Sequence, residues 1–441
     1  MKTITEFNKS HEFSKRIHEL IPAGAHTYSK GDDQFPYLAP KGIVRGKGVK
    51  VWDVDGNEYI DWAMGLTAVS LGHAYEPVLD AVRKELELGA NFQRPAVIEL
   101  EFAERLKKLF PYFDMFKFAK NGSTVTTAAV KLARAYTERE LVAVPAEHPF
   151  FSYDDWFIGS TPCDFGIPGQ YKSLTRKFSY NNLESLEKMF LENPNQIACV
   201  MMEPVKFDAP DEGYLKGVQA LCKKYGAVFI LDEMITGFRY HLQGAHQMFD
   251  VIPDLATYGK GAGNGFSVAF LAGKREIMEM GAVIPGKKKV FLVSTTHGSE
   301  THALAAAIRT IDIMENEQVV QKNWEKGRRV LAETNAIIRE YGMERYLEMI
   351  GYPVWPALVC KDSEGAVSMA YRTLFLQEMI KRGLLFQGTF TFAHLHGDSE
   401  IDQTLEAFRE SCGVYREAIE KKTVEGLLVG EPVKPVFREI N

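Results

Sequence analysis

Residues 227–239 read AVFILDEMITGFR, and this stretch decides the fold that the sequence predicts. Its first five residues are apolar, which is typical of a strand buried on both faces in a parallel sheet covered by helices. The strand runs directly into two acidic residues, Asp232 and Glu233. Because burying a carboxylate without a partner is costly, we expect a positive group to lie near these acidic residues.

The residues before this stretch predict a complete βαβ unit. ACVMMEPV, residues 198–205, reads as a strand, Tyr214 to Tyr225 reads as a helix that Gly226 closes, and AVFILDE is the next strand. The two strands of such a unit are parallel neighbours. Since ligands bind beyond the carboxyl ends of strands in an open parallel sheet, we expect Glu203 and Asp232 to lie at a site.

Side-chain alternation separates the two acids at the end of the second strand. Asp232 and Met234 face one side and would meet the same ligand, whereas Glu233 faces the other. Glu233 is expected to bind Arg239 or a backbone donor. The alternative for Asp232 is that it only caps the following turn or pairs with Arg239, since acids at strand ends commonly serve loops.

The length and the pattern of the chain predict two domains. A chain of 441 residues is longer than one hydrophobic core usually supports. GVKVWDVDGNEYIDW alternates around Asp55-Gly56, which predicts a hairpin with a two-residue turn. From about Gly65, apolar runs alternate with amphipathic helical stretches. We predict that residues 1–64 supply the N-terminal segment and hairpin of a smaller α+β domain, that 65–318 form a large α/β domain with a mainly parallel sheet, and that 319–441 complete the smaller domain.

Composition argues against several classes of partner. With 52 basic and 58 acidic residues the net charge is -6, and no basic block indicates nucleic-acid binding. The five cysteines are scattered and lack a CxxC pair, so we expect no metal site and no disulfide framework, as in a cytoplasmic protein. No apolar run has the length of a signal peptide core or a membrane span, so no membrane partner is expected.

A lysine between glycines stands in DLATYGKGAGNGFSVAFLAG, residues 254–273. Glycines allow a backbone or a flat ligand to come close to Lys260. Gly261 follows in place of Ser or Thr, and a strand follows in place of a helix, so a nucleotide phosphate loop is disfavoured. The common alternative is a solvated lysine in a flexible turn. A lysine beside a buried site can instead lose its proton and attack a carbonyl group as a neutral amine.

A third element predicts an anion site. MFKFAK reads as a strand that runs into Asn121-Gly122-Ser123, where a helix begins, and a helix N-terminus attracts anions. Alone this signal is weak, because serine often caps helices without a ligand. A phosphate site, a lysine that forms a Schiff base and a strand-end aspartate are together what pyridoxal 5′-phosphate requires. We therefore predict that Asp232 keeps the pyridine nitrogen of this cofactor protonated.

With these residues the sequence resembles the class III aminotransferases of fold type I, and most of all the glutamate-1-semialdehyde aminomutase-like branch. The resemblance covers nearly the whole chain and runs in order through SLGHAYEPV, NGSTVTTAAVKLARAYTER, MMEPV, LDEMITGFR and PDLATYGKGAGNG. It implies the fold type I architecture of a mainly parallel sheet flanked by helices. It also implies that Lys260 holds the cofactor as a Schiff base and that Asp232 pairs with the ring nitrogen.

The resemblance implies further cofactor contacts. Met234 would pack against one face of the ring, and Glu203 matches the acid of the family's Glu-Pro-Val strand end. Gly122 and Ser123 match the phosphate-binding turn. Thr296 matches the threonine that reaches the phosphate from the partner subunit, so the resemblance implies a homodimer whose active site is shared between subunits.

The sequence departs from the family pattern in several places. Where relatives have Tyr-His-Gly with an aromatic stacked on the ring, this chain has EHPFFSYDDW. The stacking residue is Phe150, Phe151 or His148, and we place Phe150 among the expected cofactor contacts. Thr124 replaces an acid after the phosphate turn, and Lys30 stands at the place of an N-terminal arginine.

The loop that is mobile in aminomutases is replaced by the shorter GLLFQGTFTFAH. These departures favour an aminotransferase that moves an amino group from a small-molecule amino donor to a separate carbonyl acceptor through the Lys260 Schiff base. The alternative is an aminomutase, which moves the amine within one molecule. A non-enzymatic binding protein on the same fold would need neither Lys260 nor Asp232.

Overall fold

The computed structural model describes residues 3–440 and divides into two compact units. The larger unit holds Glu76–Val320 together with the residues from Phe437 onward, and the smaller unit joins the chain up to Tyr75 with Gln321–Val436. We expected divisions after residues 64 and 318, and the two units divide after Tyr75 and Val320. The chain from Phe437 onward groups with the larger unit, whereas we expected all of 319–441 in the smaller one.

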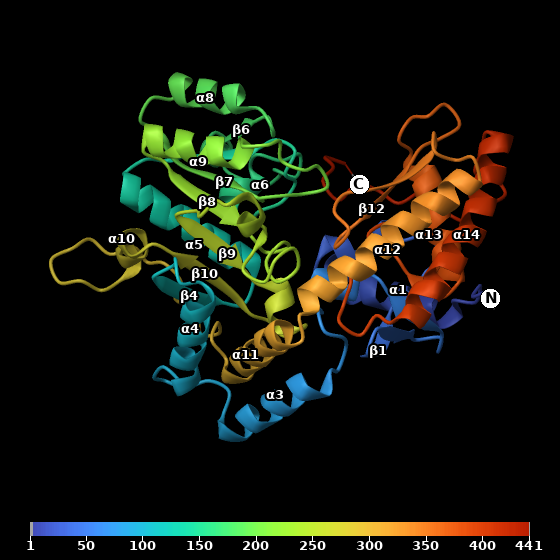
Figure 1. The fold of residues 1–441 in the computed structure, drawn as a ribbon, viewed down its shortest axis with the longest axis horizontal. Helices are drawn as coiled ribbons and strands as arrows, with labels where there is room; N and C mark the ends of the chain where they lie inside the picture. The colour runs from blue at the N-terminus through green and yellow to red at the C-terminus, as the bar shows by residue number, and fades with distance from the viewer. Residues whose placement is uncertain (1–2, 441) are drawn as a thin grey trace. The chain divides into compact units, whose positions relative to one another are not determined.

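A seven-stranded sheet forms the centre of the larger unit, in the order β4-β10-β9-β8-β7-β5-β6 (Figure 1). All neighbours are parallel except β10, which is antiparallel to both β4 and β9, so the expected mainly parallel sheet is confirmed. The strands are β4 (Met115–Ala119), β5 (Leu141–Pro145), β6 (Thr175–Phe178), β7 (Ile197–Met202), β8 (Val228–Asp232), β9 (Leu255–Tyr258) and β10 (Ala269–Gly273).

The predicted βαβ unit is confirmed. Strand β7 leads through helix α9 (Tyr214–Tyr225) to β8, and β7 and β8 pair in parallel. The helix ends at Gly226, whose φ of 66° lies in the left-handed region that glycine adopts without steric cost. A short apolar strand, an amphipathic helix and the glycine that ends it are each recognisable from neighbouring residues in the sequence. The sequence alone could therefore predict this unit.

Both faces of the sheet are buried. Alternate residues of β7 and β8, such as Met201 and Ile230, join one core cluster with helix α5 (Gly122–Thr137). The intervening residues, such as Val200 and Phe229, join a second cluster with α9 and helix α8 (Leu183–Glu192). This alternation explains why the strands read as continuous apolar runs.

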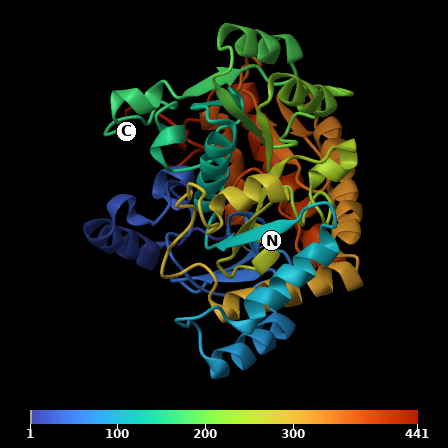
Figure 2. The ribbon, with the colours of Figure 1, turned by 90° about the vertical axis from the view of Figure 1, so that its left-hand side faces the viewer.

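Three longer helices of the larger unit pack together beside the sheet: α3 (Glu76–Leu88), α4 (Val97–Leu109) and α11 (Thr301–Asn316). Helix α11 contacts both α3 and α4, and the three lie side by side in both views (Figures 1 and 2). The short helices of the unit are α6 (Asp155–Ile158), α7 (Gly169–Lys172), α10 (Arg275–Met278) and the 3₁₀ turns Ala245–Phe249, Lys260–Gly263 and Glu279–Gly281.

The smaller unit joins segments from both halves of the chain. Its sheet has the order β1-β2-β3-β13, and β13 from the C-terminal part pairs in parallel with β3. The Trp62 indole N–H donates to Thr404 Oγ1 at 2.9 Å, which links the same parts. The elements are α1 (Asn8–Leu20), β1 (Ile43–Lys47), β2 (Lys50–Asp53), β3 (Glu58–Asp61), α2 (Met64–Thr67), α12 (Val319–Glu340), β11 (Leu347–Ile350), β12 (Ala357–Cys360), α13 (Met369–Lys381), β13 (Leu384–Leu385) and α14 (Asp398–Lys421), with 3₁₀ turns at Pro22–Gly24, Tyr28–Lys30 and Asp32–Gln34.

The predicted hairpin forms between β2 and β3, but its turn is longer than the two residues expected. The Asp53 N–H donates to the Asn57 carbonyl at 3.1 Å, which leaves three residues in the loop, and Gly56 takes a φ of 88°. The Asp53 carboxylate accepts from the N–H groups of Asp55 and Asn57 at 3.0 and 2.8 Å. These hydrogen bonds to the Asp53 side chain stabilise the longer turn.

Among the described residues, no helix is long and apolar enough to cross a membrane.

Candidate active site

Three neighbouring strands of the larger unit end at the candidate site. Asp232 is the last residue of β8, and Glu203 follows the last residue of β7, which pairs with the residue before Asp232. On the other side, Asp232 pairs with Thr257 of β9, and Lys260 begins the 3₁₀ turn after that strand. The register therefore brings two expected acids and the expected lysine to one edge of the sheet.

Asp232 is buried and uses one carboxylate oxygen for the protein. Its Oδ1 accepts from the Met234 N–H at 3.0 Å and from Thr257 Oγ1 at 2.9 Å. No donor among residues 3–440 reaches Oδ2. The turn-capping interpretation is thus correct for one oxygen, while the other is available to a ligand. Burial, and then the nearby Glu203 carboxylate, raise the pKa of Asp232, so a cation beside it would be stabilising.

Lys260 has a strained backbone and an unpaired amine. Its φ of 41° lies in the left-handed region, which costs a residue with a side chain on the order of 1 kcal/mol or more. Its amine takes part in no hydrogen bond or ion pair within the described part of the chain. Burial lowers the pKa of Lys260, against the opposing influence of Glu203 and Asp232. A neutral amine that can attack a carbonyl is therefore easier to form here than on the surface.

The residues expected to bind an anion lie at the start of α5. Asn121 is the N-cap, and its Oδ1 accepts from the N–H and the hydroxyl of Thr124 at 3.0 and 3.1 Å. The N–H groups of Gly122 and Ser123 lie in the first turn, where the helix supplies no acceptor. Ser123 is buried, and its Oγ accepts from the Tyr153 N–H at 3.1 Å, so its hydroxyl proton can be donated to an anion.

Met234 packs between the start of α5 and the turn that carries Lys260. A Cβ on Gly122 would lie 3.1 Å from Met234 Cε, and a Cβ on Gly259 would lie only 2.4 Å from the same atom. The contacts show that Gly122, Met234 and Gly259 line one space. An added Cβ at Gly122 or Gly259 would therefore displace the end of the Met234 side chain, by more at Gly259 than at Gly122.

The three aromatic candidates have different surroundings. Phe151 is buried in the core beneath α5. His148 is also buried, and its Nδ1 accepts from the Glu203 N–H at 3.1 Å. Phe150 is 45% exposed, and its ring lies 6.2 Å from the ring of Phe437. Of the three, only Phe150 is exposed.

Glu233, on the opposite side of the strand end, is held by the protein. It is fully buried and accepts from the N–H groups of Ala245 and His246 at 2.8 and 2.9 Å, and its Oε1 lies 2.8 Å from His246 Nδ1. The backbone-donor interpretation of Glu233 is therefore confirmed. This residue stabilises the turn that follows β8.

Two site residues were missed by sequence reasoning, Thr257 and Lys206. Lys206 Nζ donates to Glu203 Oε1 at 2.9 Å, three residues away along the chain. The spacing of Lys206 from Glu203 could have been noticed, but its direction follows only from the turn after β7. Thr257 could have been found by assuming that β8 and β9 are parallel neighbours and by pairing their ends.

Thr296 is exposed on the segment before α11. Its carbonyl accepts from Asn91 Nδ2 at 3.0 Å, and no hydrogen bond among residues 3–440 joins it to Gly122 or Ser123. The same segment is fixed by Glu300, which accepts from Lys120 Nζ at 2.8 Å. The structure therefore leaves the Thr296 side chain accessible.

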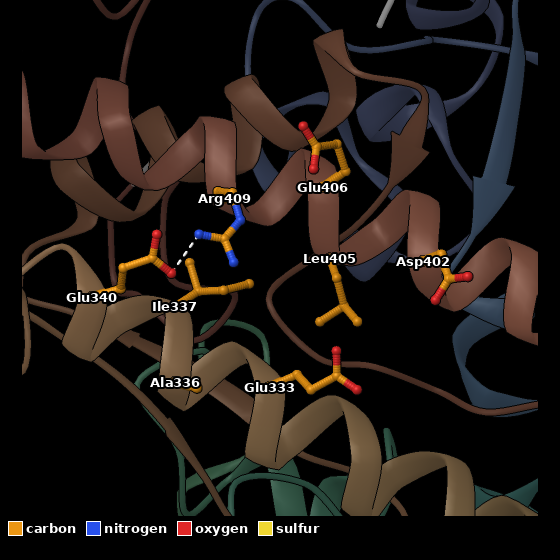
Figure 3. A pocket seen from close by; sticks show the side chains of 8 residues that line it. All are labelled: Glu333, Ala336, Ile337, Glu340, Asp402, Leu405, Glu406 and Arg409. Atoms are coloured by element: carbon orange, nitrogen blue, oxygen red, sulfur yellow. Dashed lines mark hydrogen bonds and ion pairs between the residues drawn. The ribbon is translucent and has the colours of Figure 1, made fainter.

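The hollow drawn in Figure 3 belongs to the smaller unit. It has a volume of about 360 Å³ and contains none of the residues expected to hold the cofactor. Its charged lining includes an ion pair between Arg409 and Glu340. Its residues come from α12 and α14: Glu333, Ala336, Ile337, Glu340, Asp402, Leu405, Glu406 and Arg409. Within the described ranges, no group of three or more His, Cys, Asp or Glu side chains is arranged to bind a metal ion.

Comparison with known proteins matches the chain to one family. The chain is 30% identical over 410 residues to 3-aminobutyryl-CoA aminotransferase of Cloacimonas acidaminovorans, with 91% of this chain and 96% of that protein covered. It is 32% identical over 397 residues to glutamate-1-semialdehyde 2,1-aminomutase of Persephonella marina, with 85% and 91% covered.

The fold is similar to that of solved transaminases. The pyridoxal phosphate internal aldimine form of FumI from Sphingopyxis sp. MTA144 superposes with a TM-score of 0.86 at 21% identity, covering 95% of this chain and 99% of that one. A family model described as aminotransferase class-III matches residues 28–347. The expected fold type, enzyme class and cofactor are thereby confirmed. The chain belongs to the class III aminotransferases, which use pyridoxal phosphate.

Proposed function

We propose that this aminotransferase moves an amino group between two separate small molecules, an amino donor and a carbonyl acceptor, with Lys260 and Asp232 as its catalytic residues. The observation that carries the proposal is the pair of unused groups at the strand ends. Asp232 Oδ2 has no donor among the described residues, and the Lys260 amine has no partner there. Both groups lie beyond the same edge of the sheet.

The side chains present fit pyridoxal phosphate. When bound, this cofactor forms an imine with an amine and withdraws electrons from the substrate carbon. Asp232 Oδ2 would accept from the ring N–H. The Gly122 and Ser123 N–H groups, which have no acceptor within the helix, would donate to the phosphate. Met234 and Phe150 would contact the ring, and Glu203 would lie beside Lys260 at the same edge.

Lys260 is suited to carry a proton at its Nζ atom. Once it is released from the cofactor, its buried amine is neutral in a larger fraction of molecules than an exposed lysine, because burial lowers its pKa. The amine can therefore take a proton from the substrate carbon and return it elsewhere. Because burial and the nearby Glu203 raise the pKa of Asp232, a cationic ring facing it would favour its charged form.

Transfer between separate molecules is favoured by the segment of residues 383–394. Three of its phenylalanines, Phe386, Phe390 and Phe392, are buried in the core of the smaller unit. Phe390 and Phe392 pack edge-on against Trp62, with centroid distances of 5.0 and 5.3 Å. A segment anchored by three buried aromatics is poorly suited to open and close over an intermediate, as an aminomutase requires.

A half-reaction tests this choice against the aminomutase. The enzyme is given an amino donor alone, the keto product is removed, and the absorption spectrum is followed. We expect the aminated cofactor to persist until a separate carbonyl compound is added. Rapid turnover of glutamate 1-semialdehyde without an external acceptor would instead establish the aminomutase.

We further propose a homodimer with shared active sites. Five large apolar side chains are more than 45% exposed on α3, α4 and their connection: Leu86, Leu88, Phe92, Val97 and Leu100. Asn91 of this connection binds the backbone of Thr296, so the apolar surface is continuous with the segment that would reach the partner's phosphate. A surface of this kind is typical of a protein interface.

Sedimentation and subunit mixing test the dimer. We expect a dimer mass, and weaker cofactor binding in Thr296→Ala. Mixing Thr296→Ala subunits with Lys260→Ala subunits should yield dimers in which one site has both residues intact. An active monomer, or a mixture with no gain in activity, would contradict the shared site.

We also propose that the enzyme is cytoplasmic. All five cysteines are unpaired and four of them are buried, which fits a reducing compartment. Cell fractionation with an antibody to the chain tests this proposal, and recovery in a membrane or secreted fraction would contradict it.

A further inference from the structure

The ion pair between Lys206 and Glu203 lies beside the proposed catalytic residues. Lys206 Nζ is 2.9 Å from Glu203 Oε1, and both side chains are largely buried, at 19% and 6% exposure. Glu203 is fixed further because its backbone N–H donates to the ring of His148. The pair is therefore held in one place and is not a mobile surface contact.

The geometry places two buried carboxylates on neighbouring strand ends. Met202, before Glu203, pairs with Leu231, before Asp232. Two carboxylates in such a position cannot both be charged at low cost unless a cation compensates one of them. Only Lys206 forms an ion pair with Glu203 in the described part of the chain, so the charge of Glu203 is compensated locally.

We propose that Lys206 is a positioning residue that partly compensates the charge of Glu203, so that Asp232 supplies most of the negative charge facing the cofactor ring and the Lys260 amine can release its proton. Without Lys206, the negative charge of Glu203 would act more strongly on both catalytic groups. It would oppose ionisation of Asp232 and would favour the protonated form of Lys260. Both changes oppose the chemistry, and the inference rests on the proposed role of Lys260.

The charges around Lys260 agree with this assignment. Burial is the main influence on the pKa of the Lys260 amine and lowers it. Among the charged groups, Glu203 and Asp232 raise this pKa, and Arg239 and Lys206 lower it. Arg239 is buried, and it is not substituted in any of the variants below. Lys206 is thus the one of these two cations that directly contacts Glu203.

Titration of Lys260 in single and double variants tests the proposal. The full-length chain without cofactor is acetylated with acetic anhydride across a pH series, and the rate of acetylation of Lys260 is measured by peptide mass spectrometry. The pH midpoint of this rate reports the titration of the Lys260 amine. We expect Lys206→Met to shift the midpoint upward by about one pH unit, the size of an interaction between nearby charges in a partly buried site. Glu203→Gln, which leaves Lys206 uncompensated, should shift it downward.

Two further variants separate charge from structure. Lys206→Arg keeps the charge and should leave the midpoint near that of the wild type. The double variant Glu203→Gln/Lys206→Met removes both charges and should return the midpoint close to the wild-type value. Lys216→Met, which breaks an exposed ion pair with Asp250 in the same unit, is the matched control and should produce no shift.

Opposite shifts in the two single variants and their cancellation in the double variant would support the proposal. If Lys206→Met does not fold, the downward shift of Glu203→Gln carries the test. Unchanged midpoints, or a double variant displaced as far as Lys206→Met, would overturn it. In the holoenzyme, the pH midpoint of the cofactor's visible absorption should move in the same directions. Because the labelling needs no cofactor, the two proposals can be told apart. The role of Lys206 can fail while Lys260 still binds the cofactor, and Lys260 can fail to bind the cofactor while Lys206 still shifts its titration.

Discussion

The side chain of Met234 fills the space beside Gly259, where an added Cβ would lie 2.4 Å from Met234 Cε. Gly259 itself has an extended backbone with a φ of 173°, so the contact with Met234, and not the backbone conformation, is what a larger residue there would disturb. This contact connects the residue before Lys260 to the residue proposed to pack on the cofactor ring. A small change at Gly259 should therefore be transmitted to the site.

Gly259→Ala is expected to displace Met234 and weaken cofactor binding by about tenfold or more, because a methyl group at 2.4 Å forces the neighbouring side chain to move. Equilibrium dialysis of the cofactor measures the effect. Gly217→Ala is the matched control, since its Cβ would also lie 2.4 Å from the end of a flexible side chain, that of Leu183. Equal cofactor affinities in the two variants would contradict the role of Met234.

Thr257→Val removes the hydroxyl that donates to Asp232 Oδ1 at 2.9 Å. This hydrogen bond lowers the pKa of Asp232, so its loss raises that pKa and favours the neutral acid. We expect the cofactor to remain bound, kcat to fall by about tenfold, corresponding to ~1.4 kcal/mol, and the acidic limb of the pH profile to move to higher pH. Asp232→Asn should have a larger effect. A wild-type pH profile in Thr257→Val would show that Thr257 does not tune Asp232.

His148 should make the stability of the fold sensitive to acid. Burial lowers the pKa of His148 from 6.5 to about 4. The pKa of His148 is lower in the folded chain than in the unfolded chain. The contribution of its neutral ring to the free energy of unfolding is therefore fully present above pH 6.5 and is lost as the pH falls toward 4. The contribution is about 3 kcal/mol, at roughly 1.4 kcal/mol for each pKa unit.

Urea unfolding of the wild type and of His148→Gln at several pH values measures this effect. Glutamine does not titrate, so the difference in unfolding free energy between the two proteins should narrow between pH 6.5 and 4. A difference that stays constant over this range would contradict the assignment of the titration to His148.

Much of the fold could be predicted because its signals are local. Helix α9 begins and ends at the residues predicted, since its apolar spacing and the glycine that follows it are both visible in the sequence. The hairpin was located correctly, but its turn length depends on how the Asp53 carboxylate binds the loop N–H groups. Local pattern indicates that a turn exists, whereas side-chain hydrogen bonds decide its form.

The site could be predicted where it depends on motifs, and not where it depends on register. Lys260, Asp232 and Glu203 stand at strand ends that the sequence marks directly. Thr257 reaches Asp232 only because β8 and β9 are neighbours in one particular register. Lys206 turns back onto Glu203 only because of the conformation after β7. Such contacts arise from tertiary pairing, which no single segment encodes.

Borohydride reduction of the purified holoenzyme, followed by peptide mass spectrometry, tests the central claim most directly. Reduction converts the imine between cofactor and lysine into a stable bond at the lysine that formed it. The account predicts that the peptide containing Lys260 alone carries the reduced cofactor, and that Lys260→Ala carries none. A label on a different lysine of the wild-type enzyme, or undiminished labelling of Lys260→Ala, would contradict it.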